Sequence, residues 1–207
     1  TGVALYCTNF IPPDGTSVPI STPGNSLTAG TTSLVLNRDG TALSWGDGNT
    51  TPTAVGGLSN GVAVSAGGGH SLAITGDGAV WAWGGNSSGQ LGDGTNNDSA
   101  VPVRVSGLQH ITAVAAGEVH SLALDRDGRV WAWGDNGSGQ LGDGTTVNRN
   151  TPQPVVGLND ITAIAAGKLH SMALGKDGTV WAWGGNYNGE LGDGTVANSA
   201  RPVKVGE

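Results

Sequence analysis

Apolar and polar residues alternate along this chain over short runs that are separated by residues typical of tight turns. One such stretch has alternating runs over residues 111–116, 120–124 and 129–133. Alternation with a period of two is typical of a β-strand that is buried on one face only. Asp127-Gly128 lies between the second and third runs. This dipeptide predicts a β-hairpin with a two-residue type I′ turn, in which both residues have positive φ.

A glycine-rich loop follows the hairpin and completes the unit. Residues 136–145 form this loop, and they lead to a last short strand at residues 154–156. No segment of the chain has the period of about 3.6 residues that marks an amphipathic helix. The chain is therefore predicted to be all-β, with four strands in each unit.

This unit recurs every fifty residues. Three copies, residues 58–107, 108–157 and 158–207, align without a gap. The positions that recur at this spacing are His70, His120 and His170; Trp81, Trp131 and Trp181; Trp83, Trp133 and Trp183; and Asp93, Asp143 and Asp193. Four short strands per copy are typical of a β-propeller blade, whereas a stacked β-solenoid, the second choice, usually has shorter repeats.

The N-terminal part of the chain carries weaker copies of the unit. Residues 26–57 form a shortened repeat, because the loop before Pro52 is about twelve residues shorter than in the other copies. Residues 1–25 form a degenerate half-repeat, in which Tyr6 stands at the position of the second tryptophan. We therefore expect one propeller domain of about four and a half blades, as a partial ring or as a ring that another chain completes. Open blade edges favour self-association.

The tryptophan pairs predict how the blades are joined. Trp131 and Trp133 lie two residues apart on one strand, so both indoles face the same side of the sheet. Small residues dominate the strands before them, and we predict that the indole pair of one blade docks onto the alanine-lined sheet of the next. The predicted structural core of the repeats comprises Trp81, Trp83, Trp131, Trp133, Trp181, Trp183, His70, His120 and His170.

Several of these residues also carry a resemblance to a known family. The matching segments are Ala116-Gly117, residues 120–124, Asp127-Gly128, residues 130–134 and residues 139–142. In these segments the chain resembles the regulator-of-chromosome-condensation repeat family, in its bacterial tandem-repeat form, and the resemblance covers residues 58–207. It implies a ring-shaped propeller, commonly of about seven blades. Known members differ widely in activity, from nucleotide exchange on a small GTPase to inhibition of a β-lactamase, but they share a surface that binds other proteins.

Composition and charge exclude several classes of protein. The formal net charge is −7 and the basic residues are scattered singly, so a nucleic-acid-binding surface is not expected. No apolar run approaches the length of about 18 residues that a membrane span needs, and membrane insertion is not expected. Low lysine content, abundant glycine and threonine, and the acidic balance favour a secreted or cell-surface bacterial protein, with a cytoplasmic protein as the alternative.

The repeated polar residues do not predict an active site. Equivalent histidines of separate blades would lie too far apart to share a metal ion with bonds of about 2.1 Å, and we expect each imidazole to bond to backbone within its own blade. His120 and Ser121 point to opposite faces of a strand and cannot form a catalytic dyad. We expect Asp93, Asp143 and Asp193 to accept local backbone hydrogen bonds in turns. Near-identical repeats also give near-identical environments, so we expect no enzyme activity, no cofactor and no metal.

The loops differ between copies, and they are the predicted binding surface. Loops at one rim of a propeller can converge on a partner. The predicted binding residues are Tyr187, Asn188, Arg104, Arg149 and Arg201. The leading hypothesis is a non-enzymatic module that binds a protein partner through these loops. The alternatives are a self-assembling structural subunit, a homo-oligomer or polymer that completes blades between chains, and a guanine-nucleotide exchange factor for a small GTPase.

Overall fold

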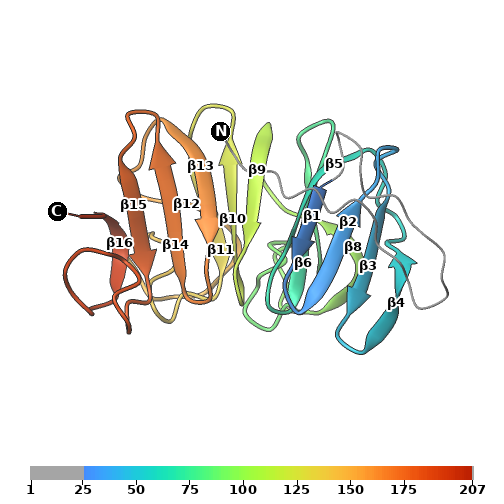
Figure 1. The fold of residues 1–207 in the computed structure, drawn as a ribbon, viewed down its shortest axis with the longest axis horizontal. Coiled ribbons are helices and arrows are strands. Elements are labelled where there is room, and N and C mark those ends of the chain that lie inside the picture. The colour runs from blue at the N-terminus through green and yellow to red at the C-terminus, as the bar shows by residue number, and fades with distance from the viewer. Residues whose placement is uncertain (1–25, 207) are drawn as a thin grey trace.

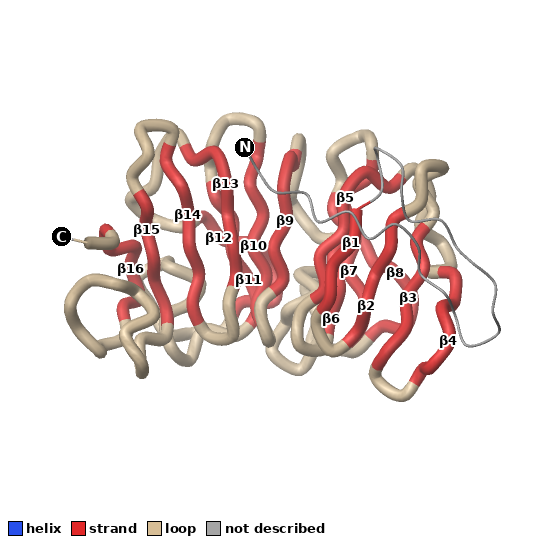
Figure 2. The backbone as a smooth tube through the Cα atoms, in the orientation of Figure 1, coloured by secondary structure: helices blue, strands red, loops and turns tan. Residues whose placement is uncertain are grey.

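The computed structural model describes residues 26–206, and the regular structure in this range consists of β-strands (Figure 2). It has four sheets, each of four antiparallel strands that follow one another in the chain. The prediction of an all-β protein with four-stranded antiparallel blades is confirmed. The predicted half-repeat 1–25 lies outside the described residues. No helix in the described range is long and apolar enough to cross a membrane.

Each sheet is one blade, numbered here in chain order. Blade 1 consists of β1 (Ser26–Ala29), β2 (Thr32–Leu36), β3 (Ala42–Gly46) and β4 (Asn49–Ala54). Blade 2 consists of β5 (Gly61–Ala66), β6 (His70–Thr75), β7 (Val80–Gly84) and β8 (Ser99–Arg104). Blade 3 consists of β9 (Ile111–Ala116), β10 (His120–Asp125), β11 (Val130–Gly134) and β12 (Arg149–Pro154). Blade 4 consists of β13 (Ile161–Ala166), β14 (His170–Gly175), β15 (Val180–Gly184) and β16 (Ser199–Lys204).

The blades stand side by side in chain order. The first strands of successive blades contact one another, β1 with β5, β5 with β9 and β9 with β13. Figure 1 shows blade 1 and blade 4 at the two ends of this array. Among residues 26–206, each blade between them is therefore covered on both faces by neighbouring blades, whereas blade 4 contacts a neighbouring blade on one face.

The hairpin between the second and third strands differs from the predicted turn. In blade 3 the strand pairing ends at Leu124 and Val130, and the amide of Gly128 donates to the carbonyl of Asp125. Gly128 has φ of 78°, but Asp127 is not among the residues with positive φ. The prediction of a two-residue type I′ turn was wrong: a longer turn with glycine at its left-handed position closes the hairpin.

Indoles and aliphatic side chains form the blade interfaces. Trp133 and Trp183 are completely buried, and Trp131 and Trp181 are partly buried. Trp133 shares its apolar cluster with Leu72, Leu91 and other residues of blade 2. Docking of indoles across the interface was predicted correctly, but the surface that receives Trp133 is formed largely by leucine and valine side chains of the preceding blade. Burying an indole against this surface stabilises the contact by roughly 2–3 kcal/mol.

The direction of the strands sorts the connections into two rims. We call one end the loop rim; it carries residues 85–98, 135–148 and 185–198 and the short turns 67–69, 117–119 and 167–169. We call the other end the turn rim; it carries the Asp-Gly turns and the connections between blades. The long loops of blades 2 to 4 therefore lie together at one rim, and the Asp-Gly turns lie together at the other.

Candidate functional site

A chain of hydrogen bonds joins blade 2 to blade 3. Nε2 of His70 lies 2.8 Å from the Ser121 hydroxyl, and that hydroxyl donates to the carbonyl oxygen of Gln90 at 2.9 Å. The indole of Trp133 donates to the same carbonyl at 2.8 Å. We call this arrangement the interface clamp. The expectation that each imidazole bonds to backbone within its own blade was wrong, because the partner is a serine of the next blade.

Blades 3 and 4 are joined by a second interface clamp. Nε2 of His120 lies 3.0 Å from the Ser171 hydroxyl, which donates to the Gln140 carbonyl at 2.8 Å. Trp183 donates to that carbonyl at 2.9 Å. The two clamps have the same geometry because their members lie at equivalent positions of the repeat.

The clamp fixes the protonation state of its histidines. Because Ser121 uses its single proton on Gln90, its oxygen accepts the proton of Nε2, and Nδ1 of His70 is left deprotonated. Burial lowers the pKa of His70 to about 4 and that of His120 to about 3. Both imidazoles are therefore neutral near pH 7. Both are closed off from solvent, so they hold blades together and are not placed to act on a substrate.

The described residues show no arrangement that would hold a metal. Within residues 26–206, no group of three or more His, Cys, Asp or Glu side chains is close enough to do so. The repeated aspartates have local roles, as predicted. Asp143 accepts from the amide of Thr145 at 2.8 Å, and Asp93 and Asp193 accept from Thr95 and Thr195 in the same way.

Buried asparagines hold the long loops of the loop rim in shape. The Asn136 side chain accepts from the amide of Leu141 at 3.0 Å, and it donates to the carbonyl oxygens of Thr145 and Val147 at 3.1 Å each. One amide thus ties together both ends of its loop. Sequence reasoning missed this residue, although the fifty-residue period marks it. The equivalent residues, each fully buried and bonded alike, are Asn86, Asn136 and Asn186.

Four of the five predicted binding residues lie at the loop rim. Tyr187 is 64% exposed at a loop tip; its hydroxyl accepts from Asn198 at 3.3 Å and lies 3.4 Å from the Ser138 hydroxyl of the preceding loop. Asn188 is exposed beside it, and its amide donates to Glu190 at 2.8 Å. Tyr187 therefore bridges two neighbouring loops while its ring faces solvent.

The predicted arginines are divided between the two rims. Arg149 forms an ion pair with Asp143 at 3.1 Å, and Arg201 lies over Gly144 of the preceding loop. Both belong to the loop rim. Arg104 is the last residue of β8, pairs with Trp81 and lies at the turn rim. The structure does not bring Arg104 together with the other four, because β8 runs from one rim to the other.

Polar grooves separate the loops of adjacent blades. A groove of about 370 Å³ lies between the loop of blade 2 and β12 of blade 3. Asn150 spans it and donates to the carbonyl of Gly94 at 2.9 Å. The groove is lined by Ser88, Asn96, Asn148, Arg149, Asn150, Thr151 and Gln153. Amide and hydroxyl groups of this kind present both donors and acceptors to a bound chain.

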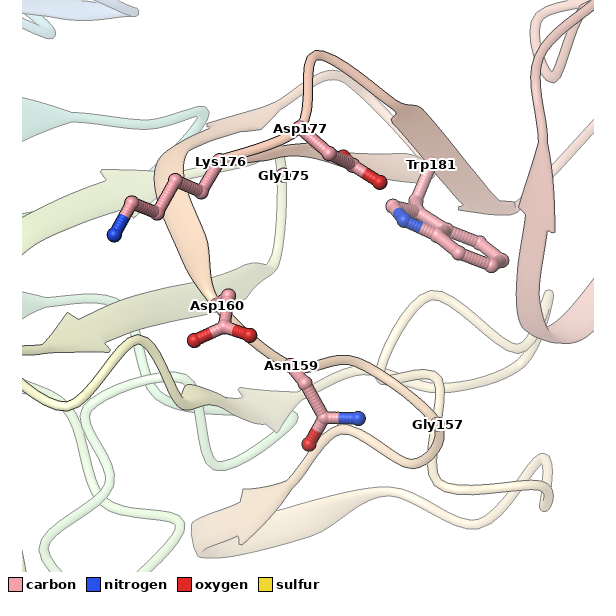
Figure 3. A pocket seen from close by; sticks show the side chains of 7 residues that line it. All are labelled: Gly157, Asn159, Asp160, Gly175, Lys176, Asp177 and Trp181. Carbon is pink, nitrogen blue, oxygen red and sulfur yellow. The ribbon is translucent and has the colours of Figure 1, made fainter.

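A second hollow, of about 450 Å³, opens at the turn rim of blade 4 (Figure 3). Trp181 and Asp177 face it. In blade 3 the side chain of Asp125 caps the equivalent turn and accepts from the Trp131 indole at 3.1 Å. Blade 4 has Gly175 at that position, so the hollow forms where the capping side chain is missing.

The two rims also differ in charge. At the turn rim, carboxylates and basic groups balance: Asp39, Asp77, Asp125, Asp127, Asp160 and Asp177 against Arg38, Arg104, Arg126, Arg129, Lys176 and Lys204. At the loop rim carboxylates predominate: Asp47, Asp93, Asp98, Glu118, Asp135, Asp143, Glu190 and Asp193 against Arg149, Lys168 and Arg201. The loop rim therefore carries a net negative charge, whereas the charges of the turn rim balance.

Solved structures with the same fold span about twice the length of this chain. Prp20p from Saccharomyces cerevisiae has 22% identity and a TM-score of 0.81, over 93% of this chain and 53% of that one. The yeast RCC1 (Prp20) chain solved with Kap60 has 23% identity and a TM-score of 0.77, over 93% of this chain and 51% of that one. Human WBSCR16 has 24% identity and a TM-score of 0.77, over 92% and 56%. At these identities the likeness shows the fold alone.

Sequence comparison identifies the repeat itself. No curated protein sequence matches the chain. A family model for the regulator of chromosome condensation (RCC1) repeat matches residues 77–124, 127–174 and 177–207. A second model for the same repeat matches residues 62–90, 111–140 and 161–190. These matches cover more than half of the sequence, and the chain therefore belongs to the regulator of chromosome condensation (RCC1) repeat family.

Proposed function

We propose that the chain is a non-enzymatic module that binds a protein partner through its loop rim. The observation that carries this proposal is that the buried residues of the long loops are the same in each blade, whereas the residues at the loop tips differ. Inside, Asn86, Asn136 and Asn186 make the same hydrogen bonds in each loop. Outside, the tips differ: Ser87-Ser88, Gly137-Ser138 and Tyr187-Asn188 occupy equivalent positions.

A rigid loop with a variable tip suits recognition. Loops that are already ordered before binding lose little conformational entropy when a partner arrives. Tyr187 adds a large amphipathic side chain at an exposed tip, and tyrosine is enriched among the residues that dominate binding energy at interfaces. The polar groove around Asn150 lies on the same rim and supplies hydrogen-bonding groups beside it.

The similar structures give a precedent for such binding. The work on Prp20p concerns its binding to Gsp1p and to histones, and yeast RCC1 has been solved bound to Kap60. We infer the general property, recognition of a protein by a propeller surface, and not any of these partners. The composition further supports our proposal that the protein works outside the cell or at its surface.

Quantitative affinity capture with matched variants tests the proposal. The purified chain is immobilised, and proteins retained from the secreted and lysate fractions of the source organism are measured by mass spectrometry. We expect the double variant Tyr187→Ala/Asn188→Ala to lose specific partners at least about tenfold, as for interface residues worth more than 1.4 kcal/mol. Asp127→Ala/Arg126→Ala, a matched pair of exposed residues at the turn rim, should retain them.

Two outcomes would contradict the proposal. One is a set of partners that is lost with the turn-rim pair and retained with the loop-rim pair. The other is the absence of any protein whose capture depends on either pair.

A further inference from the structure

The hollow at the turn rim of blade 4 has the size of a small-molecule site. Its volume of about 450 Å³ lies within the range of about 300–1,000 Å³ that is usual for ligand pockets. One wall is formed by the turn 175–177 and by Trp181 of blade 4, and the other by residues 157–160, which connect blade 3 to blade 4 (Figure 3). The hollow therefore lies at the junction of two blades that the structure describes.

The indole in this hollow is partly exposed because of its position in the repeat. Trp131 lies in a blade with a neighbouring blade on each face, and it is partly exposed, as Trp181 is. The residue beside the indole differs, since Asp125 accepts from Trp131 in blade 3 and Gly175 replaces that carboxylate in blade 4. Within residues 26–206 the Trp181 nitrogen has no hydrogen-bond acceptor, so its N–H is left to donate to a ligand.

Polar side chains surround this indole. The carboxylate of Asp177 is directed towards Trp181 (Figure 3). Asn159 and Asp160 lie on the opposite wall of the hollow. Asp177 accepts from the amide of Thr179 at 2.9 Å, and this hydrogen bond holds the pKa of the Asp177 carboxyl below its ordinary value. Asp177 is thus ionised near pH 7, and its free oxygen can accept a hydrogen bond from a ligand.

The charges around the hollow balance. The carboxylates are those of Asp160 and Asp177, and the ammonium groups are those of Lys176, which lines the hollow, and Lys204, which lies 6.0 Å from the centre of the Trp181 ring. A ligand of either charge would meet like and opposite charges in equal number, so the site favours a neutral molecule. A pyranose sugar is neutral and has an apolar face and many hydroxyls. The C–H groups of its ring can lie against the indole, and its hydroxyls can donate to carboxylates and accept from N–H groups.

We propose that this hollow binds one pyranose residue of a neutral glycan. Trp181 supplies an apolar surface and an N–H donor. The carboxylates of Asp177 and Asp160 accept from the sugar hydroxyls, and the Asn159 amide both accepts and donates. The site lies on the turn rim and is separate from Tyr187 on the loop rim, so this inference is independent of the proposed binding function.

Filling the hollow with the side chain that blade 3 has at this position tests the proposal. Gly175→Asp introduces the carboxylate of Asp125 into blade 4. The new Cβ would lie 2.7 Å from Oδ1 of Asp177, an exposed side chain that can turn away. We expect the affinity for the glycan to fall at least about tenfold while the melting temperature stays unchanged. Thr75→Asp is the matched control, because it places the same side chain at the equivalent position of blade 2 and should leave glycan binding unchanged.

The measurements identify both the ligand and the site. Neutral polysaccharide fragments, neutral protein-linked glycans and charged glycans are screened on one array, so that a hit also shows the source of the sugar. NMR titration with the free glycan gives the dissociation constant, which we expect to be about 1 mM or below for a single sugar site. The indole N–H signal that is missing in Trp181→Phe should shift during the titration, whereas the signal that is missing in Trp131→Phe should not. The loop-rim variant Tyr187→Ala/Asn188→Ala should bind the glycan like the wild-type chain.

Three results would overturn the proposal. The first is the absence of any neutral glycan that binds the wild-type chain. The second is glycan binding that a folded Gly175→Asp variant retains, or that a folded Thr75→Asp or loop-rim variant loses, since the sugar would then lie elsewhere. The third is tighter binding of a charged glycan or of N-acetylarginine amide than of any neutral glycan, since this result would assign the hollow to a charged ligand.

Discussion

The interface between blades 2 and 3 and the interface between blades 1 and 2 join similar sheets by different means. Between blades 2 and 3, His70, Ser121, Gln90 and Trp133 form the interface clamp. Between blades 1 and 2, Thr32 stands at the histidine position, since it pairs with Gly46 as His70 pairs with Gly84. Blade 1 also has a tight turn in place of the long loop, so it has no counterpart of Gln90.

The comparison separates what packing does from what the clamp adds. Both interfaces bury apolar side chains, and Leu34, Leu36 and Trp83 form one cluster across the interface of blades 1 and 2. Trp83 is 7% exposed there, whereas Trp133 is completely buried. Hydrogen bonds also join blades 1 and 2: the amide of Gly61 donates to the Gly40 carbonyl at 2.9 Å, and the amide of Ala66 donates to the Thr28 hydroxyl at 3.2 Å. Apolar packing and such bonds therefore join two blades without a clamp, and the clamp adds a buried polar network between them.

The largest expected effect is the loss of a buried indole. Trp133→Ala should lower the free energy of unfolding by about 3–5 kcal/mol, because it leaves a cavity between blades 2 and 3. Trp45→Ala, at the equivalent but partly exposed position of blade 1, should lower it by about 1–2 kcal/mol. Urea unfolding followed by circular dichroism measures both, and equal losses would show that the two positions are packed alike.

Acidification should weaken the clamped interfaces selectively. The folded pKa values of His70 and His120, about 4 and about 3, lie below the unfolded value of 6.5, so the unfolded chain binds protons first as the pH falls. Above pH 6.5 both histidines are neutral in the folded and the unfolded chain, and their contribution to the free energy of unfolding is fully present. This contribution is lost as the pH falls towards 4. The upper limit for His70 is about 3 kcal/mol.

Hydrogen exchange locates this acid effect. Between pH 6.5 and 4.5, the amides of β6 and β10, which carry the buried His70 and His120, should lose protection more than those of β2, which contains no histidine. The double variant His70→Gln/His120→Gln should remove most of the pH dependence in this window. A wild-type slope that persists in the variant would assign the effect to other groups.

Removal of one clamp hydroxyl is a smaller change. Ser121→Ala leaves Nε2 of His70 without an acceptor inside the protein, and we expect a loss of about 1–3 kcal/mol in the free energy of unfolding. Ser71→Ala is the matched control, because Ser71 is equally buried but faces the interface in which Thr32 replaces the histidine. Its loss should be below about 1 kcal/mol. Thermal and urea unfolding of the two variants give the difference, and equal losses would mean that the hydroxyl matters only through its size.

The sequence predicts the blades better than it predicts the contacts between them. The period of fifty residues and the strand alternation give the four-stranded sheets, because these features depend on neighbours along the chain. The partner of His70 is Ser121, 51 residues away, yet Ser71 lies next to it in the sequence. The repeat alone does not distinguish a bond within a blade from one between blades, because each histidine recurs together with its own serine.

For the predicted binding residues, too, the sequence gives local positions better than it gives which residues come together in space. The position of Tyr187 at a loop tip follows from the loop pattern, and its exposure agrees with that prediction. The sequence pattern also places Arg104 near a variable segment, but β8 carries Arg104 to the other rim. Asn136 was overlooked because asparagine in a glycine-rich loop is ordinarily a turn residue, and its burial depends on the closure of the whole loop.

The smallest expected effect comes from building a clamp where none exists. Thr32→His places an imidazole opposite Ser71, at the interface of blades 1 and 2, and should raise the free energy of unfolding by up to about 1 kcal/mol. The gain is small because blade 1 lacks the loop carbonyl to which the serine would donate. If the gain comes from the new hydrogen bond, adding Ser71→Ala must remove it, and this double-mutant cycle isolates the pair. A gain that survives Ser71→Ala would instead come from burial of the larger side chain, and the absence of any gain would show that the clamp requires the long loop as well as the histidine.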